Sequence, residues 1–412
     1  MTTSHDASTA VSARTRDVFA PAQLGPLTLR NRIIKAATFE GRTPDALVSD
    51  ELIEFHRSIA AGGVGMTTVA YCAVAPEGRT ERDQIYWRPE VLPGMKRLAD
   101  AVHAEGAAIS AQIGHAGPVA DESSHRCKAL TPTRFPHPLS FSMTRAATEE
   151  DIQRVTEAHA QAAIWAAECG FDAVEIHFGH NYLASSFLSP LLNRRKDAYG
   201  GSLENRARVA RGVARAVRDA VGDRIAIIAK MNMRDGIRGG FEVEESLQFA
   251  RWLQEDGSVD ALQLTAGSSL LNPMYLFHGG VPVVEFARNF RLPLRIGMLL
   301  FGRMFLKKYP YKNNYLLELA RPFRQELSLP LVHLGGVTDQ ASMNLAMDEG
   351  FEFVAMGRAL IAEPDLPLRI QRDATVQSQC IHCNRCMPTI YTGTHCPLLG
   401  THSDSLRALP SK

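Results

Sequence analysis

The sequence of 412 residues has no excess of charge of either sign, since 45 Lys and Arg residues stand against 44 Asp and Glu residues. A nucleic acid or a membrane surface recognised through bulk charge is therefore not expected. The chain also lacks a stretch of about 18 uncharged apolar residues, the length that a helix needs to cross a bilayer. Its most apolar segment, residues 294–306, is shorter and contains Arg295 and Arg303. We expect a soluble, cytoplasmic protein that acts on a small molecule.

A disulfide framework is missing as well. Three of the seven cysteines are scattered, whereas the other four lie close together near the C-terminus. Such grouping indicates metal ligation rather than cross-linking. Residues 1–16 are rich in Ser, Thr and Ala without a continuous apolar stretch, which excludes a secretory signal. We interpret them as a disordered leader, with a transit peptide as the alternative.

What the chain does contain is an alternation of short apolar runs with helical patterns. Eight runs are predicted to be strands of a parallel sheet that is buried on both faces: residues 33–38, 66–69, 108–113, 173–177, 225–231, 261–265, 331–334 and 353–356. The clearest helix follows Thr148, which forms a capping signal with Asp151, and ends at Gly170. Eight strand and helix repeats favour an α/β fold of the closed (β/α)8 type, a TIM barrel, over an open doubly wound sheet.

Two segments depart from the regular spacing. Residues 272–329, after the sixth strand, form an insertion far longer than a normal βα loop, and it mixes aromatic, apolar and basic residues. We expect it either to cover the active-site end of the barrel or to form an extra helical pair on the barrel side. The other departure is a C-terminal cysteine-rich extension, residues 373–412. The predicted barrel domain is residues 17–372.

The most distinctive residues follow the fourth strand. The chain reads His177-x-x-His180-x-Tyr182, with the run YGGSLENR further on, from Tyr199 to Arg206. A single histidine at a strand end is more often packed or capping, and a single tyrosine is more often core. Three together at the carboxyl end of a barrel strand favour an active site. In this combination the sequence resembles the Old Yellow Enzyme family, over nearly the whole chain.

The resemblance implies an FMN-dependent ene-reductase that transfers hydride from NAD(P)H to an activated carbon–carbon double bond of an enone, enoyl ester or enoyl-CoA. His177 and His180 would then donate hydrogen bonds to the substrate oxygen, and each such donor can contribute about 3 kcal/mol to the transition state. Tyr182 would protonate the α-carbon, because a phenol of pKa about 10 keeps its proton at neutral pH.

The phosphate of FMN is expected at the loops after the seventh and eighth strands. Gly335 and Gly336, with Thr338 as an N-cap, place backbone N–H groups near a helix start. Gly357 and Arg358 add a second glycine and a guanidinium suited to phosphate. Either glycine motif alone is equally consistent with an ordinary turn, but in this order the two match the family's phosphate site.

Four more residues match the family's contacts with the flavin ring: Ala37, Thr38, Gln112 and Lys230. The resemblance places Lys230 where positive charge favours the anionic reduced flavin. A buried salt-bridge lysine is the alternative. One position after Thr38, where many members carry Thr or Cys, this chain has Phe39.

The clustered cysteines are separated by two, two and nine residues: Cys380, Cys383, Cys386 and Cys396. They resemble the [4Fe–4S] segment of an iron–sulfur subgroup that includes 2,4-dienoyl-CoA reductase and trimethylamine dehydrogenase, although the last spacing is shorter than in that subgroup. Four thiolates within seventeen residues can surround one cluster. A tetrahedral zinc site and an empty vestigial site are the alternatives.

Electron supply is open at this point. No second G-x-G-x-x-G domain follows the cysteines, so we expect either direct reduction of FMN by NAD(P)H or a separate electron-donor protein. Two other functions remain: an amine or other dehydrogenase that passes electrons outward through the cluster, and a redox partner or sensor without small-molecule turnover. The complete set of His177, His180 and Tyr182 favours the reductase. The sequence leaves the natural substrate, the choice of NADH or NADPH and a homo-oligomeric state undecided.

Overall fold

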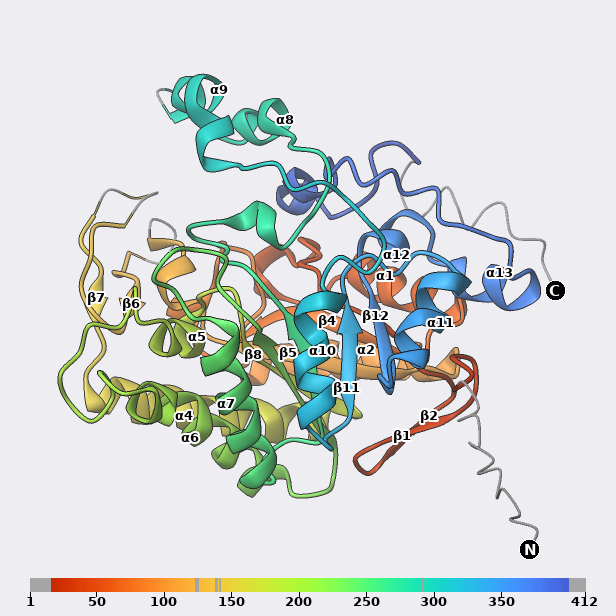
Figure 1. Ribbon diagram of the computed structural model, residues 1–412, viewed down its shortest axis with the longest axis horizontal. Coiled ribbons are helices and arrows are strands. Elements are labelled where there is room, and N and C mark those ends of the chain that lie inside the picture. Colours follow the sequence, from red (N-terminus) through yellow and green to blue (C-terminus); the bar gives the residue numbers. More distant parts are fainter. Residues whose placement is uncertain are drawn as a thin grey trace, which may run out of the picture.

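Eight parallel strands form a closed barrel, which confirms the predicted TIM barrel (Figure 1). The computed structural model describes residues 16–399, apart from residues 123–125, 138–139, 141, 291 and 293. The strands are, in spatial order, β10 (Ala261–Thr265), β11 (Leu331–Leu334), β12 (Phe353–Met356), β3 (Ile33–Lys35), β4 (Met66–Ala73), β5 (Ala108–Gly114), β8 (Ala173–Phe178) and β9 (Ala226–Asn232). Nearly all of their residues are buried, as strands covered on both faces require.

Helices cover the outside of the barrel and follow the strands in turn. They are α1 (Asp50–Ala61), α2 (Leu92–Ala104), α4 (Glu149–Glu168), α6 (Leu203–Val221), α7 (Val243–Glu255), α10 (Leu317–Glu326), α11 (Gln340–Asp348), and the short pair α12 (Arg358–Ala362) and α13 (Leu366–Arg372). The predicted start of α4 is confirmed, because the Thr148 hydroxyl accepts from Asp151 N at 3.2 Å and the Asp151 carboxylate accepts from Thr148 N at 3.0 Å.

The amino-terminal end of the barrel is closed by a hairpin of β1 (Ala22–Leu24) and β2 (Leu27–Leu29). Leu24 and Leu29 pack against the first residues of several barrel strands, among them Ala173 and Ala226. Figure 1 shows this hairpin at the bottom of the barrel, opposite the insertion and the tail. Access to the barrel interior is therefore from the carboxyl ends of the strands.

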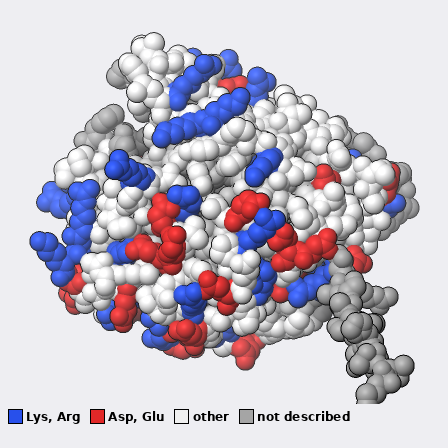
Figure 2. Space-filling view, viewed as in Figure 1, with Lys and Arg blue, Asp and Glu red and all other residues white. Residues whose placement is uncertain are grey.

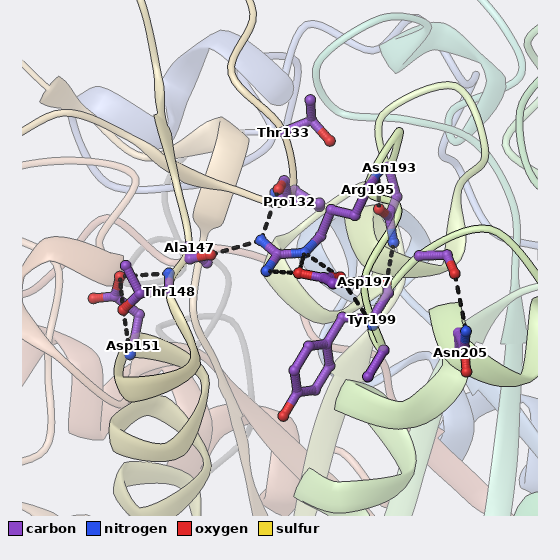
Figure 3. Close-up of polar contacts among 12 residues, drawn as sticks. Pro132, Thr133, Ala147, Thr148, Asp151, Asn193, Arg195, Asp197, Tyr199 and Asn205 are labelled. Atoms are coloured by element: carbon purple, nitrogen blue, oxygen red, sulfur yellow. Dashed lines mark hydrogen bonds and ion pairs between the residues drawn. The ribbon is translucent and has the colours of Figure 1, made fainter.

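The YGGSLENR run, which carries part of the family resemblance, forms the end of the loop after α5 (Leu183–Leu188) and the first turn of α6. Asn205 in this run donates to Gly200 O at 3.1 Å. Just before it, the Arg195 guanidinium donates to Pro132 O at 3.1 Å and to Ala147 O at 2.6 Å, and Figure 3 shows it reaching between those two carbonyls. The loop is thereby fixed to the segment around β6 (Leu130–Thr131) and β7 (Arg145–Ala146).

The insertion contains two helices in addition to the barrel helix α10. These are α8 (Val283–Arg288) and α9 (Leu294–Phe305), and they pack against each other. In Figure 1 they stand beyond the carboxyl ends of the strands, at the top of the view, rather than along the outer wall of the barrel. The insertion thus forms a helical pair, but this pair lies beyond the strand ends and not on the barrel side where it was expected.

The cysteine-rich tail packs on the same end of the barrel. Its 3-10 helix, η6 (Met387–Tyr391), is followed by Thr394, whose N–H donates to Glu40 O at 2.7 Å. Gly280 N donates to His382 O at 2.8 Å, which joins the insertion to the tail. Gly279, with φ +138°, must be glycine because a Cβ there would lie 2.1 Å from His382 O.

Two expectations concern segments that lie mostly or wholly outside the described residues. The disordered leader was expected over residues 1–16, of which the structure describes only Arg16; the guanidinium of Arg16 donates to Gly350 O at 2.8 Å. The last part of the tail, residues 400–412, is likewise outside the described residues. None of the helices that the structure describes combines the length and the apolarity that crossing a bilayer would require.

Candidate active site

Two adjoining cavities at the carboxyl ends of the strands are lined by all the residues that the sequence assigned to flavin and substrate. The glycine cavity is lined by Gly335, Gly336, Gly357 and Thr338, among others. The histidine cavity is lined by Gln112, His177, Tyr182 and Tyr71, among others. Residues that line both are Ala37, Thr38, His180, Lys230, Leu276, Phe277 and Arg358. The two spaces are therefore continuous, as a site for a cofactor beside its substrate requires.

The two histidines and the tyrosine converge because the chain turns sharply after β8. His180 and Asn181 have φ of 62° and 59°, in the left-handed region. The turn is held by His180 N, which donates to Asn232 Oδ1 at 3.1 Å. It brings the His177 ring to 5.0 Å from that of His180 and 4.5 Å from that of Tyr182, measured between centroids.

Burial sets the protonation states of this group. It lowers the pKa of His177 well below 6.5, helped by the charges of His180 and Lys230, and it lowers the pKa of His180 in the same way, helped by Lys230. Burial also raises the pKa of the Tyr182 phenol. At neutral pH the site therefore offers two uncharged imidazoles, each with one N–H, and one phenol that keeps its proton.

The imidazoles differ in their partners. His180 Nε2 lies 3.0 Å from the Thr265 hydroxyl, so this hydroxyl holds one edge of the ring. His177 Nδ1 is buried and has no hydrogen-bond partner among the described residues. Burying an unpaired polar atom is costly, and such atoms are retained where a ligand completes the hydrogen bond.

Tyr71 belongs to this site but was not predicted. Its ring meets the Tyr182 ring edge to face, with 5.3 Å between centroids, and its hydroxyl donates to Gly78 O at 2.9 Å. The predicted second strand ended at Val69, whereas β4 continues to Ala73 and carries Tyr71 into the cavity. Tyr71 therefore supports the position of Tyr182 while its own hydroxyl is already engaged.

Glu175 is the second unpredicted member. It lies opposite Gln112 in the register of β5 and β8, and its carboxylate accepts from Gln112 Nε2 at 2.6 Å. The same oxygen lies 3.7 Å from Lys230 Nζ on β9. The alternative of a buried ion-pair lysine is thus confirmed, and because Lys230 also lines both cavities its contact with a flavin stays a prediction. Glu175 fixes the directions of the amide and the ammonium.

The glycine cavity fits the phosphate end of FMN in its backbone. Gly335 and Gly336 have φ of 111° and 89°, which side-chain-bearing residues rarely adopt. A Cβ on Gly336 would lie 2.8 Å from Asn314 N, so a side chain here would collide with the segment that precedes α10. The Thr38 hydroxyl, which borders both cavities, is buried and has no partner among the described residues.

The predicted N-cap after these glycines was wrong by one residue. The helix α11 is capped by Asp339, whose carboxylate accepts from Ser342 N at 2.7 Å, and the Ser342 hydroxyl accepts from Asp339 N at 3.1 Å. Asp is as good an N-cap residue as Thr, and here Asp339 forms a reciprocal capping box with Ser342, whereas Thr338 forms none. A carboxylate therefore occupies this helix start, which leaves anion binding to the glycine backbone and to Arg358.

Arg358 stands where three cavities meet. It lines the glycine cavity, the histidine cavity and a third space, the cysteine cavity. Its Nη1 donates to His278 O at 2.9 Å and also to the Asn384 side chain, which ties the eighth strand to the insertion and the tail. The guanidinium is thus held in place by neutral partners, and it lines both the glycine cavity and the cysteine cavity.

All four clustered cysteines line the cysteine cavity: Cys380, Cys383, Cys386 and Cys396. Burial raises the pKa of the Cys386 thiol to about 12 and also raises that of Cys380, while the charge of Arg358 acts in the opposite direction on both. In the described part of the chain, no three Cys, His, Asp or Glu side chains stand close enough to share one metal ion. Cys386 borders the histidine cavity as well, so the two spaces are neighbours.

Comparisons with known proteins agree with this arrangement. Residues 17–268 match the model of the NADH:flavin oxidoreductase / NADH oxidase family. A 4,4'-dithiodibutanoate disulfide reductase from Rhodococcus erythropolis is 50% identical over 385 residues, which cover 93% of this chain and 96% of that protein.

Two solved structures share the fold. A 2-naphthoyl-CoA reductase matches 86% of this chain with a TM-score of 0.74 and 26% identity. The chain spans about half of that protein, since the match covers 52% of it. An Old Yellow Enzyme homologue from Zymomonas mobilis matches 93% of this chain and 98% of its own, with a TM-score of 0.71 and 23% identity.

Proposed function

Because the chain belongs to the NADH:flavin oxidoreductase / NADH oxidase family and is an Old Yellow Enzyme-like flavin-dependent oxidoreductase, we propose that it reduces carbon–carbon double bonds activated by a carbonyl group. One observation carries the proposal. Two neutral imidazoles and a protonated phenol line a single cavity that is continuous with the glycine cavity. NAD(P)H is the proposed electron source.

FMN, when bound, would supply the hydride. The N–H groups of His177 and His180 would hold the carbonyl oxygen of the acceptor, which gains negative charge as the hydride adds to the β-carbon. Donors aimed at such an oxygen typically contribute about 10²- to 10³-fold each to the rate. Tyr182 would then give its proton to the α-carbon, so that one hydride and one proton together saturate the double bond.

A second candidate acceptor is a disulfide, because the Rhodococcus relative with 50% identity is named for reduction of 4,4'-dithiodibutanoate. Here the hydride would add to one sulfur, the S–S bond would break, and the departing thiolate would take a proton from Tyr182. The reacting sulfurs carry no carbonyl oxygen. The histidine pair would therefore matter much less for a disulfide than for an enone.

The test is anaerobic reoxidation of the dithionite-reduced protein by one acceptor at a time. We expect the absorption of oxidised flavin to return when 2-cyclohexenone is mixed with the reduced protein. Reoxidation by 4,4'-dithiodibutanoate alone would replace the alkene with the disulfide as the acceptor. If neither compound reoxidises the flavin, the reductase proposal is wrong, and turnover of amines with an artificial electron acceptor becomes the assay to run.

Tyr182→Phe is expected to slow reoxidation by 2-cyclohexenone at least about tenfold without loss of FMN, because the carbon loses its proton donor. Stopped-flow absorbance of the oxidative half-reaction measures the effect. Tyr71→Phe is the matched control, since it removes the same atom from the adjacent ring but one that is bound to Gly78 O. Equal slowing in both variants would remove Tyr182 from the proton transfer.

Arg358→Ala is expected to weaken FMN binding about tenfold to hundredfold, the value of a charge-assisted contact with phosphate. The dissociation constant is measured by titrating apoprotein with FMN and following flavin fluorescence. Arg372→Ala, on the exposed last turn of α13, is the control. An unchanged dissociation constant in Arg358→Ala would contradict the phosphate assignment.

We also propose that the cysteine cavity holds a [4Fe–4S] cluster, with zinc as the competing occupant. The supporting observation is that all four cysteines line one cavity, as the four ligands of a single cluster must. Burial disfavours the deprotonated form of these thiols, and a bound metal centre would offset that cost because its positive charge stabilises the thiolate ligands. A cluster here would allow a separate redox protein to exchange electrons with the flavin site.

A further inference from the structure

The even charge balance of the whole chain conceals a strongly basic segment. Residues 283–312, which include α8 and α9, contain seven Lys and Arg residues and one acidic residue, Glu285. This segment therefore carries +6 in a chain whose total is +1, so the remainder carries −5. Glu285 is itself paired with Arg385 at 3.0 Å. Figure 2 shows long basic side chains gathered at the top of the molecule, where Figure 1 places α8 and α9.

The basic side chains of this segment point to solvent. Five exposed ones lie on α8, on α9 or directly after α9: Arg288, Arg295, Arg303, Lys307 and Lys308. None of the five forms an ion pair with any residue that the structure describes. Their charge is thus available to an external partner.

The same segment exposes an unusual amount of apolar surface. Fourteen large apolar residues are exposed in the described part of the chain, and seven of them lie between Val284 and Met304. On α9 the exposed fractions reach 69% for Leu300, 62% for Phe301 and 77% for Met304, while Gly302 is its only buried residue. A helix that is apolar on most of its surface is normally covered.

We propose that α8 and α9 bind the surface of an anionic phospholipid bilayer, with the apolar side chains of α9 inserted among the acyl chains and the five basic side chains at the headgroups. A peripheral helix of this kind combines a large apolar face with Lys and Arg, and anionic lipid attracts the basic groups. The even overall charge argues only against binding through bulk charge; a local basic segment is a different feature.

Two other occupants fit the surface less well. A second copy seated on this face through a two-fold axis would bring one +6 segment against another. Protein interfaces are enriched in aromatic residues and depleted in Lys, whereas six of the seven exposed apolar residues here are not aromatic, and Lys307 and Lys308 lie beside them.

Membrane binding would have a consequence for the site. Phe286 of α8 lines the histidine cavity, so the helical pair that contacts the bilayer also forms part of the cavity wall. An apolar acceptor dissolved in the bilayer would then meet the protein next to the cavity.

The experiment is flotation of the full-length holoprotein with vesicles of phosphatidylcholine alone or mixed with an equal amount of phosphatidylglycerol. We expect the partition coefficient to be at least about tenfold higher for the mixed vesicles, and to fall with added salt. The variants Leu300→Asp with Phe301→Asp, and Arg303→Glu with Lys307→Glu and Lys308→Glu, should each reduce it at least about tenfold.

Controls separate these results from misfolding and from self-association. Leu345→Asp on α11 and Arg372→Glu on α13 change exposed residues of the same kinds elsewhere and should leave partition unchanged. All variants should retain FMN and the melting temperature of the parent. Equal partition into both vesicle types, or no loss in the α9 variants, would overturn the proposal. Sedimentation as a dimer that the α9 variants dissociate would assign the surface to a second copy.

Discussion

Replacing both His177 and His180 with alanine is expected to slow reoxidation of the reduced protein by 2-cyclohexenone by about 10⁴-fold, because each donor contributes about 10²-fold, and this is the largest kinetic effect of any change in the histidine cavity. Both imidazoles are neutral because burial lowers their pKa values well below 6.5, so they act as hydrogen-bond donors and not as cations. A donor needs no change of protonation as the substrate oxygen gains charge. The rate is measured by stopped-flow absorbance after reduction with dithionite, which makes NAD(P)H binding irrelevant to the result.

Two controls sharpen this experiment. His177→Asn with His180→Asn retains N–H donors at both positions and should recover part of the lost rate, whereas a purely structural role would not distinguish Asn from Ala. His103→Ala, which removes a partly exposed histidine paired with Asp172, should have no effect. With 4,4'-dithiodibutanoate as the acceptor, the double alanine variant should lose far less of its reoxidation rate. An enone rate within threefold of the parent's would remove the histidines from the reaction.

The barrel was predictable because strands that are buried on both faces consist mostly of apolar residues, and such runs can be recognised in the sequence. The predicted bounds of β10, β11 and β12 agree with the structure, since these short strands are mostly apolar and are buried almost from end to end. The first strand was predicted to reach Thr38 but β3 ends at Lys35. Residues 36–38 are partly or fully buried without pairing in the sheet, because they line the cavities. Hydrophobic patterning reports burial, and it cannot tell a sheet residue from a cavity wall.

The site residues that the sequence missed depend on register rather than on pattern. Glu175 reaches Gln112 and Lys230 because β8 lies between β5 and β9 with one particular alignment, although Gln112 and Glu175 are 63 residues apart along the chain. Tyr71 was not predicted as a site residue because β4 shifts its register between Val69 and Cys72. This shift places the Tyr71 ring beyond the predicted end of the strand. No periodicity in a single sequence encodes either alignment.

The exposure of α9 was beyond sequence reasoning for a similar reason. Residues 294–306 were correctly judged too short to span a bilayer. Their pattern would equally suit a helix packed against the barrel wall, and only the placement of α8 and α9 beyond the strand ends leaves Leu300 and Met304 exposed.

For the tail, the expected result is about four iron and four sulfide per chain in anaerobically purified protein, and loss of most of both in Cys383→Ser. Each thiolate holds one corner of a cluster, and a serine hydroxyl is a poor substitute for it. Iron and acid-labile sulfide are measured chemically, and the thiolate-to-iron absorption that overlaps the flavin bands should disappear. Cys127→Ser, which changes an exposed cysteine outside the cavity, should keep the full content.

FMN content decides between a local and a global effect of Cys383→Ser. The glycines, Thr38 and Lys230 proposed to hold FMN come from the barrel strands and their loops, and Cys383 does not border either of their cavities. FMN should therefore remain, and so should reoxidation by 2-cyclohexenone, if the cluster serves only as an entry or exit for electrons. Arg358 is the structural link between the two parts, because it lines all three cavities. One zinc per chain and no iron would make the tail a structural element, and NAD(P)H acting directly on FMN would then be the remaining electron route.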